Sequence, residues 1–181
     1  MENNGIGKLF EGVDRWTVLI YVLIVLVGFV AILSASYEEG AESIFSFSHF
    51  YMKQLVWMGI SFAVAVVVLL VDASIYHKWA YLFYVLGLLT LVAALLFGRE
   101  VNGAKAWFEI GSVRIQPVEF AKIATALALA RVMSSSSFSI NRAGDLFKVG
   151  LVICLPLLII VMQNDTGSGI VLVSLLFVLY R

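Results

Sequence analysis

Long uncharged apolar runs alternate with short polar segments along this chain. Residues 16–34, 54–71 and 79–98 contain no Asp, Glu, Lys or Arg. A helix of about 20 residues, at roughly 1.5 Å per residue, crosses the ~30 Å hydrocarbon layer of a bilayer. Each of these three runs is therefore predicted to be a membrane-spanning helix.

The run 115–133 is a weaker, fourth predicted span, because Glu119 and Lys122 interrupt it. Their spacing of three residues places both charges on one face of a helix. A charge at the centre of a membrane helix costs roughly 2.5–3.5 kcal/mol, so the two charges are expected to be paired.

The stretch 149–180 holds one charge, Asp165. As a single helix it would be about 48 Å long, which exceeds the bilayer. The segment 163–169, QNDTGSG, is rich in residues that favour turns and helix ends. We therefore expect a break there, with spans at 149–163 and 168–181 and a sequence that stops partway through its architecture.

Composition agrees with this pattern. Hydrophobic residues make up 62% of the chain and charged residues 13%, and the mean hydropathy is +1.01. The prediction is an all-α polytopic membrane protein, one transmembrane domain over residues 1–181 with five to six helices.

The formal net charge of zero argues against nucleic acid as a partner. The single cysteine, Cys154, is expected to pack as a small hydrophobic residue.

Orientation follows from Lys and Arg in alternate loops. Seven fall on the side of the amino terminus and four on the other, with Lys122 set aside as intramembrane. This bias predicts a cytoplasmic amino terminus. The loops 35–51 and 99–115 and the turn at Asp165 are then external.

Arg114, Glu119 and Lys122 admit two interpretations. Glu119 and Lys122 either form an internal ion pair near the outer interface or border a polar cavity that receives an ionic group of a substrate. Arg114 either makes that cavity net positive or serves as an interfacial anchor. The residues alone indicate an outward-facing, positively biased cavity suited to an anionic amphiphile or an exported solute.

The loop before this span contains Trp107 and Phe108, and Gly103 and Gly111 permit tight turns. Pro117 suits the first turn of the following helix. The loop is therefore expected to be ordered. The two aromatic residues fit an interfacial belt or a re-entrant element packed over the cavity.

Two motifs carry a resemblance to a known family. NGAKAWFEIGSVRIQPVEFAKIA, residues 102–124, resembles the signature of the SEDS family (shape, elongation, division and sporulation proteins), GAxRWI followed by QPSEFAK. QNDTGSGIV, residues 163–171, resembles that family's QPDLGTAIV. The NDTGS form is more similar to the elongation-type RodA branch than to the division-type FtsW branch.

The resemblance implies a peptidoglycan glycosyltransferase of the bacterial inner membrane that polymerises lipid II, an undecaprenyl-pyrophosphate-linked substrate. The implied partners are a class B penicillin-binding protein and other elongation or division machinery. The family has about ten transmembrane helices, so the chain is expected to be the amino-terminal half. The family's catalytic Asp lies in an outer loop of the other half, so no catalytic residue and no activity are expected in these residues alone.

The resemblance also implies substrate-binding residues, and it leaves cofactors open, a divalent cation such as Mg²⁺ included. No metal ligands are expected. The substrate-binding candidates are Arg114, Glu119, Lys122, Asp165, Lys105, Trp107 and Gln116.

The chain departs from the family pattern at four positions. Ala106 replaces the usual Arg, Val118 the usual Ser, Asn164 the usual Pro and Thr166 the usual Leu. Two other classes of function remain open on sequence grounds. A lipid-linked precursor flippase or other membrane transporter would use the same cavity and broken helices, and a scaffold would need only the helices and loops.

Overall fold

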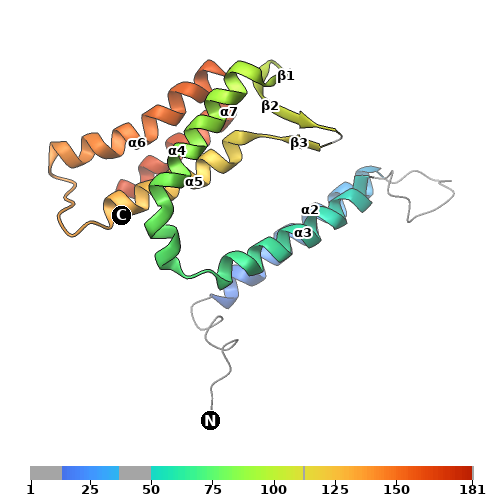
Figure 1. Ribbon diagram of the computed structural model, residues 1–181. Coiled ribbons are helices and arrows are strands. Elements are labelled where there is room, and N and C mark those ends of the chain that lie inside the picture. The colour runs from blue at the N-terminus through green and yellow to red at the C-terminus, as the bar shows by residue number, and fades with distance from the viewer. Residues whose placement is uncertain (1–13, 37–49, 112, 181) are drawn as a thin grey trace, which may run out of the picture. The chain divides into compact units, whose positions relative to one another are not determined.

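The computed structural model describes residues 14–36, 50–111 and 113–180 of the chain (Figure 1). It is a mainly helical protein, as expected, and it divides into two compact units, residues 1–72 and 73–181. Among the described residues, four helices are long and apolar enough to cross a membrane. They are α2, α3, α4 and α6.

The first unit is a pair of helices, α2 (Arg15–Ser36) and α3 (Phe50–Leu70), which contact each other. Most of their apolar side chains are exposed, as suits helices surrounded by lipid. Asp14 caps α2, accepting hydrogen bonds from the Thr17 hydroxyl at 2.7 Å and the Trp16 amide at 3.1 Å. These bonds lower the pKa of Asp14, the one to Thr17 most. Most of the predicted external loop 35–51 lies outside the described residues.

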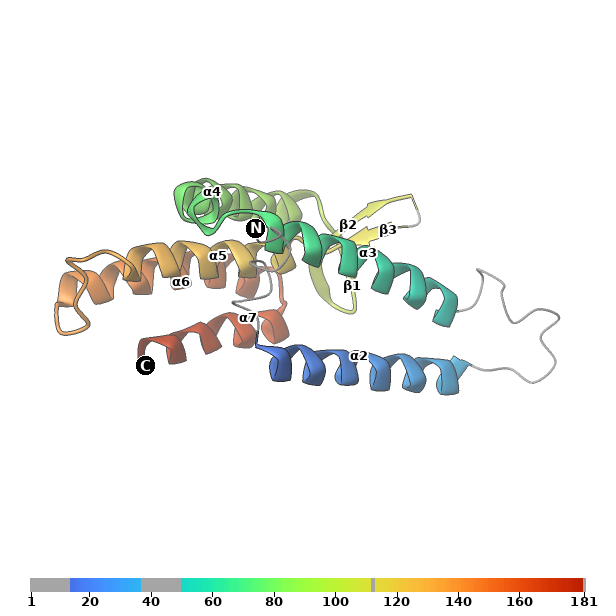
Figure 2. The same cartoon turned by 90° about the horizontal axis from the view of Figure 1, so that it is seen from below.

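The second unit is built around a short central helix, α5 (Pro117–Met133). It packs against both α4 (Ala73–Phe97) and α6 (Ala143–Met162) (Figure 2). With 17 residues α5 is about 26 Å long, shorter than the ~30 Å hydrocarbon layer. The two charges in its first turns therefore lie close to one end of the helix bundle.

Small residues bring α4 and α5 close together. Gly87 of α4 faces α5 so closely that a Cβ atom there would lie 3.4 Å from the Cα of Ala121 and from the Cβ of Ala124. Ala80 and Ala94 of α4 are fully buried. Between membrane helices such small residues permit the close backbone approach that strengthens van der Waals packing.

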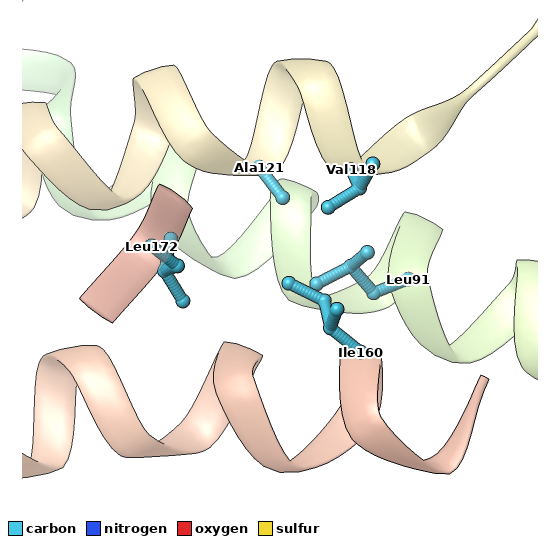
Figure 3. Packing of buried hydrophobic residues seen from close by; sticks show 5 residues of the cluster. All are labelled: Leu91, Val118, Ala121, Ile160 and Leu172. Carbon is cyan, nitrogen blue, oxygen red and sulfur yellow. The ribbon is translucent and has the colours of Figure 1, made fainter. Parts of the chain in front are cut away.

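The main apolar cluster takes residues from four helices, α5 supplying two of the five. The short helix α7 (Thr166–Val173) takes part because it folds back against α6 (Figure 3). A 3₁₀ helix, Ser174–Tyr180, follows α7. Cys154, by contrast, is exposed on α6, so its expected packing is wrong. The members of the main cluster are Leu91, Val118, Ala121, Ile160 and Leu172.

A three-stranded antiparallel sheet fills the loop between α4 and α5, in the order β1 (Arg99–Val101), β2 (Ala104–Ile110), β3 (Val113–Ile115). Asn102 and Gly103, with φ of 54° and 83°, join the first two strands. A two-residue Asn-Gly connection with both φ positive is the preferred hairpin turn. The loop that the sequence predicted to be ordered is therefore a small β-sheet.

A three-residue segment separates α6 from α7, within the stretch where a break is expected. Asn164 adopts the left-handed conformation that ends helices, with φ of 59°. The side chain of Asp165 then accepts a hydrogen bond from the Ser168 amide at 3.2 Å and caps α7.

Candidate functional site

Two polar segments that are distant in sequence meet at one end of the second unit. Gln116 immediately precedes α5, and Asp165 immediately precedes α7. The Gln116 Nε2 donates a hydrogen bond to the Asp165 Oδ2 at 2.9 Å, across 49 positions of sequence. The carboxylate that caps α7 therefore also holds the start of α5, and the two sequence motifs become one structural unit.

Gln163 connects three elements at the same place. Its Nε2 donates to the carbonyl of Leu91 in α4 at 2.8 Å, and its own carbonyl accepts from the Lys105 amide of β2 at 2.9 Å. Only 1% of Gln163 is exposed, and its Oε1 has no hydrogen-bond partner among the described residues. Because the Leu91 carbonyl can only accept, it fixes the amide orientation and leaves Oε1 as a buried acceptor.

Lys105 fastens β2 to the end of α4. Its Nζ donates to the carbonyl of Leu96 at 3.2 Å, in the last turn of that helix. A cation at this position also interacts favourably with the negative end of the helix dipole. The sheet is thus attached to the helices by both the backbone and the side chain of one residue.

Glu119 and Lys122 form an ion pair with an Nζ–Oε1 distance of 2.8 Å. The carboxylate side chain is 57% exposed, whereas the lysine side chain is only 21% exposed. The pair is therefore asymmetric, with an ammonium group partly enclosed by the helices and a carboxylate at the surface.

Arg114 pairs with a different carboxylate. Its Nε donates to the Glu109 Oε1 at 2.8 Å, and Arg99 binds the other oxygen of Glu109. The hydrogen bond from Arg114 is the main cause of a lowered pKa of Glu109, and the charge of Arg99 adds to it. Arg114 and Lys122 thus each pair with a different carboxylate, one on the sheet and one on α5, and their sharing of a substrate cavity stays a prediction.

Trp107 lies opposite Arg99 in the β1–β2 register and is partly buried. The neighbouring Ala106 is 1% exposed. Alanine therefore occupies an enclosed position of the sheet where the SEDS signature usually has arginine.

Two residues of this arrangement, Glu109 and Gln163, are not among the candidates that the sequence predicts. Glu109 lies directly opposite Arg114 in the β2–β3 register, so recognising the hairpin would have identified the partner. The sequence predicts Gln163 only as part of a turn, because its burial depends on the packing of α4 against α6.

This end of the unit carries the cations Arg99, Lys105, Arg114 and Lys122, which could donate charge-assisted hydrogen bonds to a phosphorylated ligand. Among the described residues, no three His, Cys, Asp or Glu side chains lie together in a group that could hold a metal ion.

Known proteins are similar to this chain in sequence and in fold. The chain is 38% identical over 136 residues to the peptidoglycan glycosyltransferase RodA of Treponema pallidum, covering 71% of this chain and 30% of that protein. It is 32% identical to the stage V sporulation protein E of Bacillus subtilis, covering 89% of this chain and 45% of that one. The chain spans less than half the length of these curated relatives.

Solved structures agree. The rod shape determining protein RodA of Thermus thermophilus superposes with a TM-score of 0.77 at 29% identity, covering 90% of this chain and 51% of that chain. A peptidoglycan synthase complex gives a TM-score of 0.75 at 28% identity, covering 90% of this chain and 45% of the matched chain. The family model described as cell cycle protein, for FtsW, RodA and SpoVE, matches residues 14–180. The chain therefore belongs to the FtsW/RodA/SpoVE family of multi-pass membrane proteins.

Proposed function

We propose that this chain forms part of a peptidoglycan glycosyltransferase that polymerises lipid II for cell elongation and shape. The observation that carries the proposal is the hydrogen bond from Gln116 to Asp165, which joins the two family motifs at the start of the helix that carries the partly enclosed Lys122. The name of the Treponema pallidum relative, a peptidoglycan glycosyltransferase, supports the reaction, and that of the Thermus thermophilus protein, a rod shape determining protein, supports the role in shape. We place the protein in the bacterial inner membrane with a cytoplasmic amino terminus.

The proposed reaction is attack by a sugar hydroxyl on the anomeric carbon of a lipid-linked sugar. A new C–O bond forms, the bond to the pyrophosphate breaks, and the hydroxyl proton passes to a carboxylate base. Charge then develops on the departing undecaprenyl pyrophosphate. Cations that neutralise this charge in a partly dehydrated site lower the barrier.

Lys122 is the cation best suited to this role, because Glu119 holds its ammonium group in place. Arg114 donates to Glu109 through Nε, and among the described residues its terminal nitrogens have no hydrogen-bond partner. Those nitrogens and Lys122 would bind pyrophosphate oxygens through charge-assisted hydrogen bonds. The other candidate residues position the backbone and the sugar-binding surface around these cations. They are Lys105, Gln116, Trp107 and Asp165.

We expect the carboxylate base to lie in an outer loop outside residues 1–181. We therefore expect residues 1–181 alone to lack polymerase activity. We also expect a class B penicillin-binding protein as a partner, which the peptidoglycan synthase complex among the similar structures supports.

The test uses the intact purified protein with lipid II and no other transferase present. Lys122→Gln should reduce the polymerisation rate roughly 10- to 150-fold, the effect of losing one charge-assisted contact worth about 1.5–3 kcal/mol in the transition state. The matched control is Lys148→Gln, assayed in neutral detergent without anionic phospholipid, where it should leave the polymerisation rate unchanged. Lys148 forms an ion pair of the same 2.8 Å length and the same three-residue spacing at the opposite end of the unit.

An unchanged polymerisation rate in Lys122→Gln would contradict the role of Lys122. Transport of a fluorescent lipid-linked sugar across vesicles by the wild-type protein, without any glycan polymer, would instead establish the flippase alternative.

A further inference from the structure

The two ends of the second unit differ sharply in charge. The end with the sheet and the starts of α5 and α7 is neutral, since four cations there accompany four carboxylates. They are Arg99, Lys105, Arg114 and Lys122 with Glu100, Glu109, Glu119 and Asp165. The other end, at the α5–α6 connection and the start of α4, has four cations and one carboxylate. They are Lys78, Arg131, Arg142 and Lys148 with Asp145, and this set of residues is called the basic end below.

The basic end therefore carries a formal charge of +3. Asp72, which directly precedes α4 along the chain, reduces the excess to +2 if it is included. The imbalance is not explained by the fold, because a single buried carboxylate does not need four cations.

One cation of the basic end is held rigidly. The Nη1 of Arg131 donates to the carbonyls of His77 and Lys78 at 2.5 and 2.6 Å, and its guanidinium lies 4.6 Å from the centre of the Tyr81 ring. These contacts tie the end of α5 to the start of α4. None of them neutralises the positive charge.

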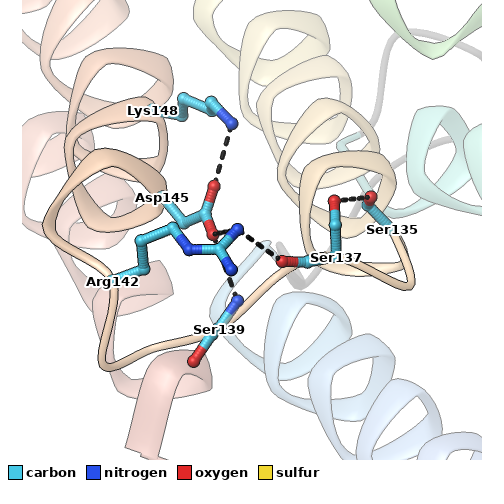
Figure 4. Close-up of polar contacts among 6 residues, drawn as sticks. All are labelled: Ser135, Ser137, Ser139, Arg142, Asp145 and Lys148. Carbon is cyan, nitrogen blue, oxygen red and sulfur yellow. Dashed lines mark hydrogen bonds and ion pairs between the residues drawn. The ribbon is translucent and has the colours of Figure 1, made fainter.

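Two further cations lie on either side of the one carboxylate (Figure 4). Asp145 accepts from Lys148 Nζ at 2.8 Å and from the Ser139 amide at 3.2 Å, and Arg142 lies 3.6 Å away. The Asp145 side chain is only 6% exposed, whereas those of Arg142 and Lys148 are 63% and 64% exposed. The buried carboxylate thus holds the two cations in position, and their side chains remain accessible to solvent.

The helices that carry these charges indicate which kind of anion they would meet. Both α4 and α6 are long enough to span a membrane, and both begin at the basic end. Trp79 and Tyr81 are half-exposed near the start of α4, as is typical of aromatic residues at the headgroup level. Cations at that depth meet lipid headgroups before they meet any soluble anion.

We propose that the basic end binds the phosphate groups of anionic phospholipids in the adjacent leaflet, with Arg142 and Lys148 as the exposed contacts. Binding there would fix the depth of α4 and α6 in the membrane. The proposal depends on the membrane location and not on glycosyl transfer, so it stands or falls separately from the proposed function.

The experiment measures retention of dioleoylphosphatidylglycerol by the intact protein, using native mass spectrometry after titration in neutral detergent. Each cation removed from a membrane-facing patch weakens binding by about fivefold, the equivalent of ~1 kcal/mol. Arg142→Gln and Lys148→Gln should each show this loss. Asp145→Asn should instead strengthen binding by a similar factor, since it removes the one negative charge and keeps an acceptor for the Ser139 amide.

Arg99→Gln is the matched control, because it removes an exposed, ion-paired cation from the neutral end. It should leave lipid retention within twofold of wild type. Melting temperatures in phosphatidylcholine alone check that each variant is folded. If Arg142→Gln does not fold, the other two variants test the proposal. Lys148→Gln should weaken lipid binding and Asp145→Asn should strengthen it.

Equal losses in Arg99→Gln and Lys148→Gln would overturn the proposal, and so would unchanged retention in the folded variants of the basic end. Competition by free glycerol phosphate at the same concentration as the lipid would also overturn it, because the site would then bind soluble phosphate.

Discussion

Tyr84→Phe should cost about 1 kcal/mol of unfolding free energy, but only while Pro156 is present. Pro156 lies inside α6 and has no N–H to donate to the carbonyl four residues earlier, which belongs to Val152. The hydroxyl of Tyr84 in α4 donates to this same carbonyl at 3.0 Å. A hydrogen bond between helices therefore replaces the one that proline removes within a helix.

The magnitude follows from what the phenylalanine leaves behind. A part-buried carbonyl without a donor costs about 1–3 kcal/mol, and hydrogen bonds between membrane helices average about 0.6 kcal/mol with a maximum near 1.7. We take about 1 kcal/mol for Tyr84→Phe with Pro156 intact. In a Pro156→Ala background the amide of residue 156 can bind the Val152 carbonyl, so the same change should cost about 0.3 kcal/mol or less.

The assay is a double-mutant cycle on the purified protein in detergent, with unfolding followed by helical circular dichroism. The coupling between the two positions should be at least ~0.5 kcal/mol, as is usual for residues that share a partner. Tyr81→Phe is the control. That hydroxyl has no hydrogen bond among the described residues, so its removal should change stability little.

Equal costs of Tyr84→Phe in the two backgrounds would refute the reasoning, because the tyrosine would then not be substituting for the missing amide. A cost for Tyr81→Phe as large as that for Tyr84→Phe would refute it as well.

Three further predictions rest on other contacts. Arg114→Gln should raise the pKa of Glu109 toward 4.5, which ¹³C NMR of labelled glutamate can measure. Because the pKa of Glu109 is depressed in the folded protein, the ion pair stabilises the hairpin above pH 4.5. This stabilisation is lost as the pH falls through the pKa of the folded protein. Gly87→Ala should be tolerated at its 3.4 Å contacts, whereas Gly87→Leu should lower stability in thermal unfolding by about 1–3 kcal/mol through overpacking. Reporters fused after Asn102 and Ser137 should read as external and cytoplasmic, and the reverse pattern would invert the topology.

The membrane character of the chain could be predicted from the sequence because hydropathy is a local property. A run of apolar residues long enough to cross lipid forms a helix there whatever lies beside it, since the backbone must satisfy its own hydrogen bonds. The end of α6 was similarly accessible, because Asn164 and Asp165 favour helix ends and caps through their own short side chains. The Asn102–Gly103 turn was equally local, but its sheet was not anticipated.

The candidate site could be predicted only in part from the sequence. Its motifs were identified by resemblance, and the Glu119–Lys122 pair follows from helical spacing. The partner of Arg114 did not follow, because it depends on the register between two strands, and a shift of one residue would replace Glu109 with a side chain from the other face.

Only the tertiary structure decided which distant polar groups meet. Three hydrogen bonds join segments that are distant in sequence. They run from Gln116 to Asp165, from Gln163 to the carbonyl of Leu91, and from Tyr84 to a carbonyl of α6. Each depends on how two helices are rotated and shifted against each other. That arrangement is set by the packing of small residues along α4 and α5, where side chains from the whole unit compete for the same space, and no single stretch of sequence contains it.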